Sequence, residues 1–272
     1  MYKLTILLVF IFYYEFSNSQ NIYVGIHMNQ DREYKTVKPK MIYEANTYYL
    51  SGKPIIINII KTLDQRGTLV TEERFAENGD KILKLQYLND TINVKIISLI
   101  FERWTRGYEK MFFNYTYDSN KCLKSITEKD STGKVVDRYE YECNDKGHPF
   151  QVYQFDKNGE RVLKESASYF YSQNFAETLQ YINGTSISKD TIKINGKLAC
   201  KFSATTETYN SSCDIVSFKR YDANGNEFLF EREYIYDSYG NRVEERSFTI
   251  STDPDGKQLK EPDEILKKKY LY

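Results

Sequence analysis

The chain has 272 residues, and its 38 Lys and Arg residues balance 38 Asp and Glu residues, so its formal net charge is zero. A protein that binds nucleic acid normally carries a basic excess, so this balance argues against nucleic acid as a partner. A hydrophobic fraction of 40% can build a core, which excludes an acidic disordered chain. The 25 Tyr and 16 Phe residues suit pleated, half-buried strands, so the composition predicts a β-rich globular protein.

Residues 1–19 have the features of a secretory signal peptide. A basic start precedes the apolar run of residues 4–16, and residues 17–19 (Ser-Asn-Ser) supply a small-x-small cleavage site. The apolar run is shorter than the roughly 20 residues of a membrane span. We predict cleavage near Ser19, a secreted, periplasmic or cell-surface location, and a mature chain that does not span a membrane. A buried N-terminal strand is the alternative interpretation.

The four cysteines lie in the predicted mature part and indicate disulfides, with three connectivities open. They are Cys122, Cys143, Cys200 and Cys213. A two-residue loop at residues 132–133 would place Cys122 opposite Cys143, although another turn type would shift this register. Cys200 and Cys213 could close a second hairpin, and free buried thiols are the alternative. Because no CxxC or zinc spacing occurs, no metal is predicted.

A turn motif recurs along the chain, with a closing Gly and, except at residues 76–79 where Ala76 leads, a leading Asp or Asn. It occurs at residues 64–67, 76–79, 118–120 (without glycine), 130–133, 144–147, 156–159, 222–225, 237–240 and 253–256. We expect the leading side chain to bond turn amides, and the glycine to adopt the left-handed conformation of a type I turn with a bulge. The clearest instances are Asp156 with Gly159, Asp222 with Gly225, and Asp237 with Gly240.

The spacing of these turns leaves about eight residues, or one strand, between consecutive turns. The sequence therefore predicts an all-β fold: an extended antiparallel meander of strand-turn units in one domain over residues 20–272, with little helix. Aromatic residues before the turns are expected to stack across strands. These are Tyr117, Phe155, Tyr221 and Tyr236. Residues 165–213 lack the motif and form an irregular insertion, with strands at 185–194 and 197–205 and a short helix near 174–181.

Residues 234–242 read Tyr-Ile-Tyr-Asp-Ser-Tyr-Gly-Asn-Arg. This stretch resembles the YD repeat of Rhs-type proteins, whose consensus is Tyr-x-Tyr-Asp-x-x-Gly-Asn-Arg, and residues 155–161 and 221–226 match less fully. The resemblance extends over residues 60–164 and 214–260. It implies a long antiparallel sheet that can curl, in an exported bacterial protein, and it supplies no catalytic residues.

No catalytic motif is present, so we predict a protein that is not an enzyme and uses no cofactor. The histidines, His27 and His148, lack the spacing of a metal site or a catalytic triad. The P-loop, the nucleophile elbow and the Gly-x-Gly-x-x-Gly motif are absent. Carboxylate pairs are formal candidates for a glycan-active enzyme, although charged residues on strands usually serve solubility. These pairs are Glu231 with Glu233 and Glu244 with Glu245.

An aromatic cluster is the one feature that favours a binding function. It comprises Trp104, Tyr108, Tyr115 and Tyr117. Exposed Tyr and Trp rings can stack on sugars or anchor a protein, whereas packing within a thin sheet is the alternative. We therefore predict a binding module whose partner is a glycan or a cell-envelope protein. A periplasmic carrier of lipids or other hydrophobic molecules, with a curved half-barrel sheet lined by residues 54–60, is the alternative function.

Overall fold

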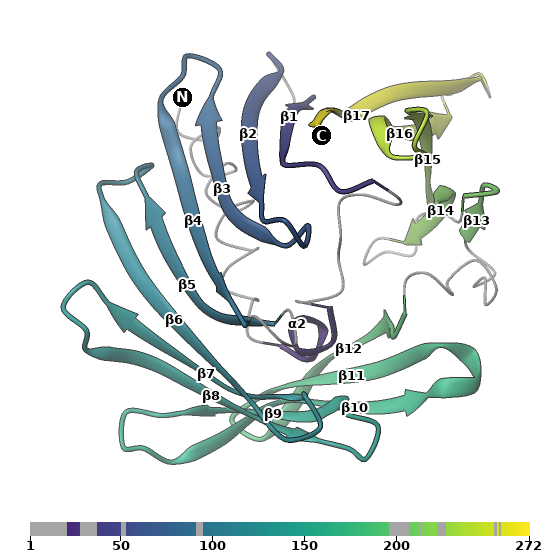
Figure 1. Ribbon diagram of the computed structural model, residues 1–272. Coiled ribbons are helices and arrows are strands. Elements are labelled where there is room, and N and C mark those ends of the chain that lie inside the picture. Colours follow the sequence, from purple (N-terminus) through teal and green to yellow (C-terminus); the bar gives the residue numbers. More distant parts are fainter. Residues whose placement is uncertain are drawn as a thin grey trace. The chain divides into compact units, whose positions relative to one another are not determined.

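The computed structural model describes residues 21–27, 37–49, 53–90, 95–195, 207–212, 214–221, 227–252, 255 and 257–272 (Figure 1). Within these residues the chain forms seventeen strands of one antiparallel sheet, one short helix α2 (Ile22–His27) and one 3-10 turn η1 (Tyr171–Gln173). The predicted all-β antiparallel meander with little helix is thus confirmed.

The strand bounds follow chain order. They are β1 (Met41–Tyr48), β2 (Ile55–Leu63), β3 (Leu69–Ala76), β4 (Lys81–Asn89), β5 (Ile96–Arg103), β6 (Glu109–Tyr117), β7 (Leu123–Asp130), β8 (Val135–Cys143), β9 (Pro149–Phe155), β10 (Arg161–Phe170), β11 (Phe175–Ile182), β12 (Thr185–Lys193), β13 (Glu207–Tyr209), β14 (Ile215–Tyr221), β15 (Glu227–Tyr236), β16 (Arg242–Thr252) and β17 (Gln258–Leu271).

The chain divides into two compact units. Unit 1 comprises the described residues within 1–31, 90–99 and 111–194, and unit 2 those within 32–89, 100–110 and 195–272. In unit 1, strands β6 to β12 pair in chain order. In unit 2, β1 pairs with β2 on one side and with β17 on the other, so the first and last strands of the chain lie side by side.

The leading Asp side chains accept hydrogen bonds from the turn amides, as the sequence predicts. Asp156 Oδ1 accepts the backbone N–H groups of Asn158 and Glu160 at 2.8 and 2.9 Å, and Asp237 Oδ1 bonds two turn amides in the same way. The closing glycines, Gly159 and Gly240, adopt positive φ angles of 82° and 78°, where a side chain would be strained. The predicted turn with Asp222 and Gly225 lies outside the described residues.

The turn between β7 and β8 differs from the expected two-residue loop. Gly133 N–H donates to Asp130 O, and Asp130 N–H donates to Lys134 O, each at 3.0 Å, so the loop contains three residues. A bulge in β8 compensates, because pairing shifts from Lys129–Val135 to Glu128–Asp137. The two shifts cancel, and the ladder returns to the register that places Cys122 opposite Cys143.

The part of the segment at residues 165–195 is more regular than expected. The predicted helix near residues 174–181 is wrong, because β11 (Phe175–Ile182) occupies this position and pairs with β10 and β12. Asn174, with a φ of 58°, ends η1 and redirects the chain into the strand. The predicted strand at 185–194 matches β12, whereas the one at 197–205 lies outside the described residues.

Paired tyrosines of the form Tyr-x-Tyr tie strands to earlier turns. The first ring of each pair donates its hydroxyl to a backbone carbonyl at 2.5–3.0 Å, and the second accepts an asparagine amide at 2.8 Å. The pairs are Tyr169 with Tyr171, Tyr234 with Tyr236 and Tyr270 with Tyr272; the asparagines are Asn144, Asn210 and Asn241. Much of the Tyr excess therefore satisfies backbone and turn groups between repeats.

Helix α2 packs on strands β9 and β10 of unit 1 (Figure 1). Ile22 and Ile26 are buried, and His27 Nε2 lies 2.6 Å from Lys193 O. A Cβ at Gly25 would lie only 2.7 Å from Pro149 Cγ, so this close approach needs glycine. The short helix is therefore held by packing and specific hydrogen bonds rather than by its length.

Glu165 is a buried carboxylate that anchors α2. It is 5% exposed, and its Oε2 accepts the N–H of Ile22 at 2.6 Å. Burial raises the pKa of Glu165, and the nearby Asp190 adds to the rise, while hydrogen bonds from Ile22 and Thr178 oppose it. Because the net shift is upward, the folded state holds the proton more readily than the unfolded state.

The Glu165→Gln variant is therefore expected to gain stability relative to the wild type as the pH rises. The contribution of Glu165 is fully present below its unfolded pKa of about 4.3 and is lost as the pH rises through the folded pKa. Glutamine carries no such proton, and its Oε1 can still accept the Ile22 N–H. Urea unfolding between roughly pH 4 and pH 8 measures this difference; a constant or opposite trend would contradict the argument.

Buried ion pairs interrupt the apolar face of unit 2. Ile42 and Glu44 share a face of β1, and Glu44 Oε1 lies 3.1 Å from Lys61 Nζ and 3.1 Å from Lys268 Nζ. The residues of β2 that face the same way, Ile57 and Ile59, are buried beside this cluster. The run at residues 54–60 therefore adjoins fixed charges instead of extending into a continuous apolar lining.

Candidate functional site

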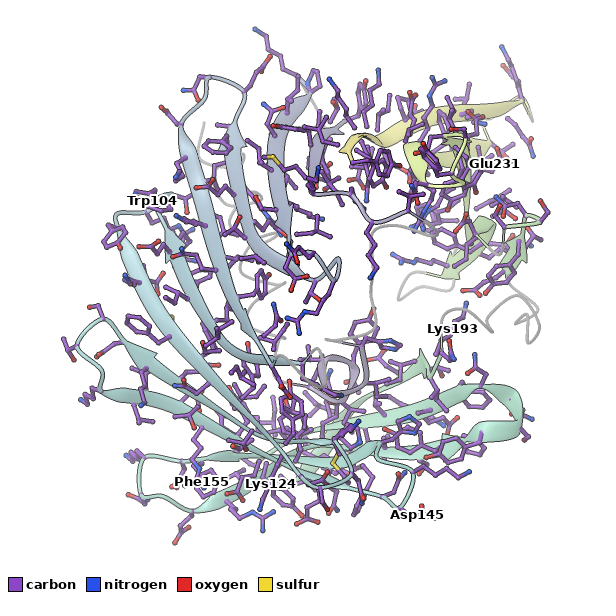
Figure 2. All side chains as sticks on the ribbon, viewed as in Figure 1. Trp104, Lys124, Asp145, Phe155, Lys193 and Glu231 are labelled. Carbon is purple, nitrogen blue, oxygen red and sulfur yellow. A yellow bond between two sulfur atoms is a disulfide. The ribbon has the colours of Figure 1, made fainter. Side chains whose placement is uncertain are left out.

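Trp104, labelled in Figure 2, lies at the connection between β5 and β6 in unit 2, where its ring meets that of Tyr108. Their ring centroids are 5.6 Å apart, with an interplanar angle of 50°. The backbone N–H of Trp104 donates to the backbone carbonyl of Ile82 at 3.0 Å, which holds this part of the chain beside β4. Trp104 is half-buried, whereas Tyr108 is 59% exposed. In this pair the Trp104 ring is partly packed against the protein, and the Tyr108 ring is accessible to a ligand.

A cation and a further ring border this pair. Lys81 Nζ lies 5.5 Å from the Trp104 ring centroid and 5.6 Å from that of Phe75, and it forms an ion pair with Glu73 at 2.8 Å. We call Phe75, Lys81, Trp104 and Tyr108 the aromatic platform. Phe75 and Lys81 were not predicted from the sequence, although both flank the turn at residues 76–79, which brings them to the same end of the hairpin.

Glu102 sets the position and the charge of Tyr108. The Tyr108 hydroxyl donates to Glu102 Oε1 at 2.6 Å, and Lys110 Nζ lies 3.6 Å from the same oxygen. The hydrogen bond to Glu102 raises the pKa of Tyr108, and the same bond, together with Lys110, lowers the pKa of Glu102. Near neutral pH the site therefore presents a neutral phenol whose ring is tethered at its polar edge.

Tyr115 and Tyr117, the other predicted ligand-binding residues, belong to unit 1. The Tyr117 hydroxyl donates to Ile96 O at 2.8 Å, and Lys95 Nζ lies 5.2 Å from the centre of its ring. Tyr115 is half-buried, and burial raises its pKa strongly. These contacts indicate packing within the sheet, so we exclude both residues from the aromatic platform.

The glutamate pairs considered for catalysis all form ion pairs. Lys260 Nζ bridges Glu231 and Glu233 at 3.1 and 2.7 Å. Glu244 is 2.5 Å from Arg246 Nε, and Glu245 lies 3.1 Å from Arg242 Nη1. Figure 2 shows Glu231 on β15. Each of these carboxylates is paired with a nearby cation, which favours the solubility interpretation.

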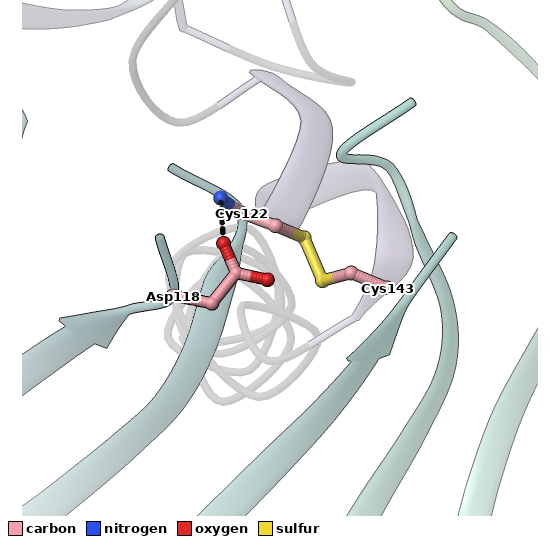
Figure 3. A group of neighbouring side chains, drawn as sticks. All are labelled: Asp118, Cys122 and Cys143. Atoms are coloured by element: carbon pink, nitrogen blue, oxygen red, sulfur yellow. Dashed lines mark hydrogen bonds between the residues drawn. A yellow bond between two sulfur atoms is a disulfide. The ribbon is translucent and has the colours of Figure 1, made fainter. Parts of the chain in front are cut away.

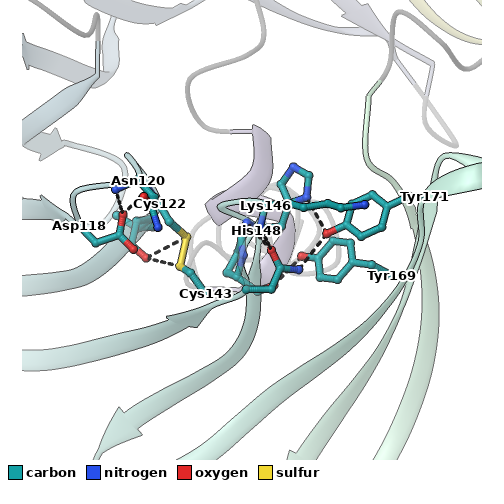
Figure 4. The surroundings of a disulfide bond; sticks show 11 residues. Asp118, Asn120, Cys122, Cys143, Lys146, His148, Tyr169 and Tyr171 are labelled. Carbon is teal, nitrogen blue, oxygen red and sulfur yellow. Dashed lines mark hydrogen bonds between the residues drawn. A yellow bond between two sulfur atoms is a disulfide. The ribbon is translucent and has the colours of Figure 1, made fainter.

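The predicted disulfide between Cys122 and Cys143 is confirmed (Figure 4). It lies beside the turn that begins at Asn144. In that turn His148 stacks on Tyr169, with 5.3 Å between ring centroids, and its Nδ1 lies 3.1 Å from the Tyr171 hydroxyl. Burial lowers the pKa of His148, so its ring is neutral near pH 7. Cys200 and Cys213 lie outside the described residues.

Among the described residues, no helix has the length and apolar character needed to cross a membrane.

Comparisons with known proteins leave the function open. No protein-family model and no curated protein matches the chain. A solved porin-like protein from Bacteroides uniformis is similar, with 11% identity over 88% of this chain and 99% of that chain and a TM-score of 0.48. The solved TcdB2-TccC3-TEV structure is similar at 8% identity over 81% of this chain and 15% of that chain, with a TM-score of 0.26.

Proposed function

We propose that the chain is an exported, non-enzymatic binding module whose aromatic platform binds a glycan. The observation that carries the proposal is the tethered Tyr108 ring, which stays 59% exposed beside Trp104. Single exposed rings are common on protein surfaces, so the proposal relies on the grouping of Tyr108 with Trp104 and Phe75 and not on exposure alone. Export rests on the signal-peptide pattern of residues 1–19 and on the resemblance to YD-repeat proteins.

The platform suits a sugar because it combines ring faces with fixed polar groups. The C–H face of a pyranose packs on an aromatic ring, while its hydroxyls need donors and acceptors nearby. Glu102, Lys81 and Lys110 supply charged groups at the edge of the rings. Because the Tyr108–Glu102 bond already holds the phenol, little side-chain entropy remains to be lost on binding.

Trp104→Ala and Tyr108→Ala are each expected to weaken glycan binding at least tenfold, equivalent to about 1.4 kcal/mol. A glycan array probed with the mature chain identifies the ligand, and calorimetry then measures the dissociation constants. Tyr43→Ala is the matched control, because Tyr43 lies in the same unit and is 38% exposed, outside the platform. Its affinity should equal that of the wild type.

Two results would refute the glycan proposal. One is an array without any binding above background by the wild-type chain. The other is a ligand whose affinity survives both platform substitutions, which would place the binding surface elsewhere. A pull-down from outer-membrane extract that captures a protein, with retention lost on Trp104→Ala, would keep the platform and assign it a cell-envelope protein instead.

A further inference from the structure

Three potential metal ligands meet at the disulfide of unit 1. A carboxylate oxygen of Asp118 and the sulfur atoms of Cys122 and Cys143 all lie within 4.8 Å of one another (Figure 3). In the part of the chain that the structure describes, no other group of at least three His, Cys, Asp or Glu residues is close enough to hold a metal ion. The sequence predicts the turn at residues 118–120 and the pairing of the two cysteines separately, and the structure shows that the Asp118 carboxylate also lies beside the sulfur atoms.

Asp118 uses only one of its oxygens to hold the turn. Its Oδ1 accepts the N–H groups of Asn120 and Cys122, each at 2.9 Å. Figure 3 shows the second oxygen directed toward the two sulfur atoms. In the turn at residues 144–147, Asn144 has the same role, because its Oδ1 accepts two backbone N–H groups of the turn at 3.0 and 3.1 Å. The negative charge at position 118 is therefore not needed for the turn.

The backbone places the two cysteines close enough to share one ion. The Cα atoms of Cys122 and Cys143 are 6.4 Å apart, and both sulfurs lie near Leu123 O, at 3.7 and 3.5 Å. Cys122 and Leu123 are each 2% exposed, while Asp118 and Cys143 are half-buried. An ion could thus enter from the side of Asp118 and reach an otherwise enclosed pair of sulfurs.

We propose that reduction of this disulfide creates a site for one thiophilic divalent cation, bound by Cys122, Cys143 and Asp118. A dithiol reductant transfers two electrons and two protons to the disulfide and becomes a disulfide itself. Binding of the cation then releases the two thiol protons to solvent, because thiolates are the ligands. Two thiolates and one carboxylate suit Zn²⁺ or Cd²⁺ and leave one coordination position open.

Disulfide and metal are then alternative cross-links of the same hairpin. Either one joins the chain ahead of β7 to the end of β8. The hairpin would therefore be cross-linked by the disulfide under oxidising conditions and by the metal ion under reducing conditions.

Cd²⁺ is the probe for this site, because cadmium–thiolate bonds absorb in the ultraviolet. We expect the reduced wild-type chain to bind Cd²⁺ with this charge-transfer band and to unfold at a higher temperature when Cd²⁺ is present. The oxidised chain and the reduced Cys122→Ser/Cys143→Ser variant should lose the band contributed by this site. Asp118→Asn keeps the turn, as Asn144 shows, and should weaken Cd²⁺ binding at least about tenfold.

Several results would overturn the proposal. A reduced wild-type chain with neither the band nor a rise in unfolding temperature excludes the site, whether or not reduction alone loosens the fold. A band of equal size in Cys122→Ser/Cys143→Ser assigns the metal to other residues. Unchanged affinity in Asp118→Asn removes the carboxylate from the site and refutes the three-ligand arrangement.

Discussion

Glu44→Leu is expected to lower the free energy of unfolding by roughly 3–5 kcal/mol. Glu44 is 6% exposed, and it is the shared partner of Lys61 and Lys268 at 3.1 Å each. Removing the carboxylate leaves two ammonium groups without their common partner in a region from which water is largely excluded. The cost comes mainly from keeping two cations buried after the shared negative charge is removed, rather than from the lost attraction. Urea unfolding followed by circular dichroism measures the change.

Two further variants separate this explanation from ordinary loss of packing. Glu231→Gln removes the carboxylate of an exposed ion pair, with Lys260 at 3.1 Å, and should change stability by about 1 kcal/mol or less. Combining Glu44→Leu with Lys61→Met and Lys268→Met should recover part of the lost stability, because the three charges of this cluster are removed together. Glu72, which lies opposite Lys61 and is 6% exposed, keeps its ion pair with Arg74 at 2.7 Å. A triple variant that is less stable than Glu44→Leu would refute the charge-burial explanation.

The repeated turns made the fold predictable from the sequence. Each turn fixes where a strand ends and the next begins, so the antiparallel meander follows from local chemistry alone. Even the disulfide could be anticipated, although the turn itself was not as expected. The loop contains one residue more than predicted, because it includes Gly133 as its third residue. The bulge in β8 shifts the pairing by one residue in the opposite direction, so the ladder keeps the predicted register. Errors of this kind cancel only when a bulge lies close to the turn.

Contacts between segments that are distant in the sequence could not be predicted in this way. Nothing in the turn motif says that β1 pairs with β17, and this pairing is what places Lys268 opposite Glu44. The neighbours of Trp104 could not be predicted for a related reason. Tyr115 and Tyr117 follow Trp104 closely in the sequence, yet they pack within unit 1, while Phe75 and Lys81 reach Trp104 from an earlier hairpin.

The Cys122→Ser/Cys143→Ser variant is expected to lose about 3 kcal/mol of stability under oxidising conditions. The bond joins residues 21 positions apart, so its removal lets the unfolded chain explore many more conformations. Both sulfurs also approach Leu123 O, so serine hydroxyls can take over polar contacts there and the loss should reflect the missing cross-link. Chemical unfolding of the variant and the oxidised wild type measures this difference.

The strands that are destabilised by loss of the disulfide are also predicted. Because both cysteines belong to unit 1, hydrogen exchange should accelerate for amides of β7 and β8. Amides of β2, in unit 2, should exchange at the wild-type rate. Reduced wild-type chain without metal should show the same faster exchange in β7 and β8. A loss well below about 1 kcal/mol, or faster exchange centred on β2, would mean that the cross-link does not constrain unit 1 as its loop length requires.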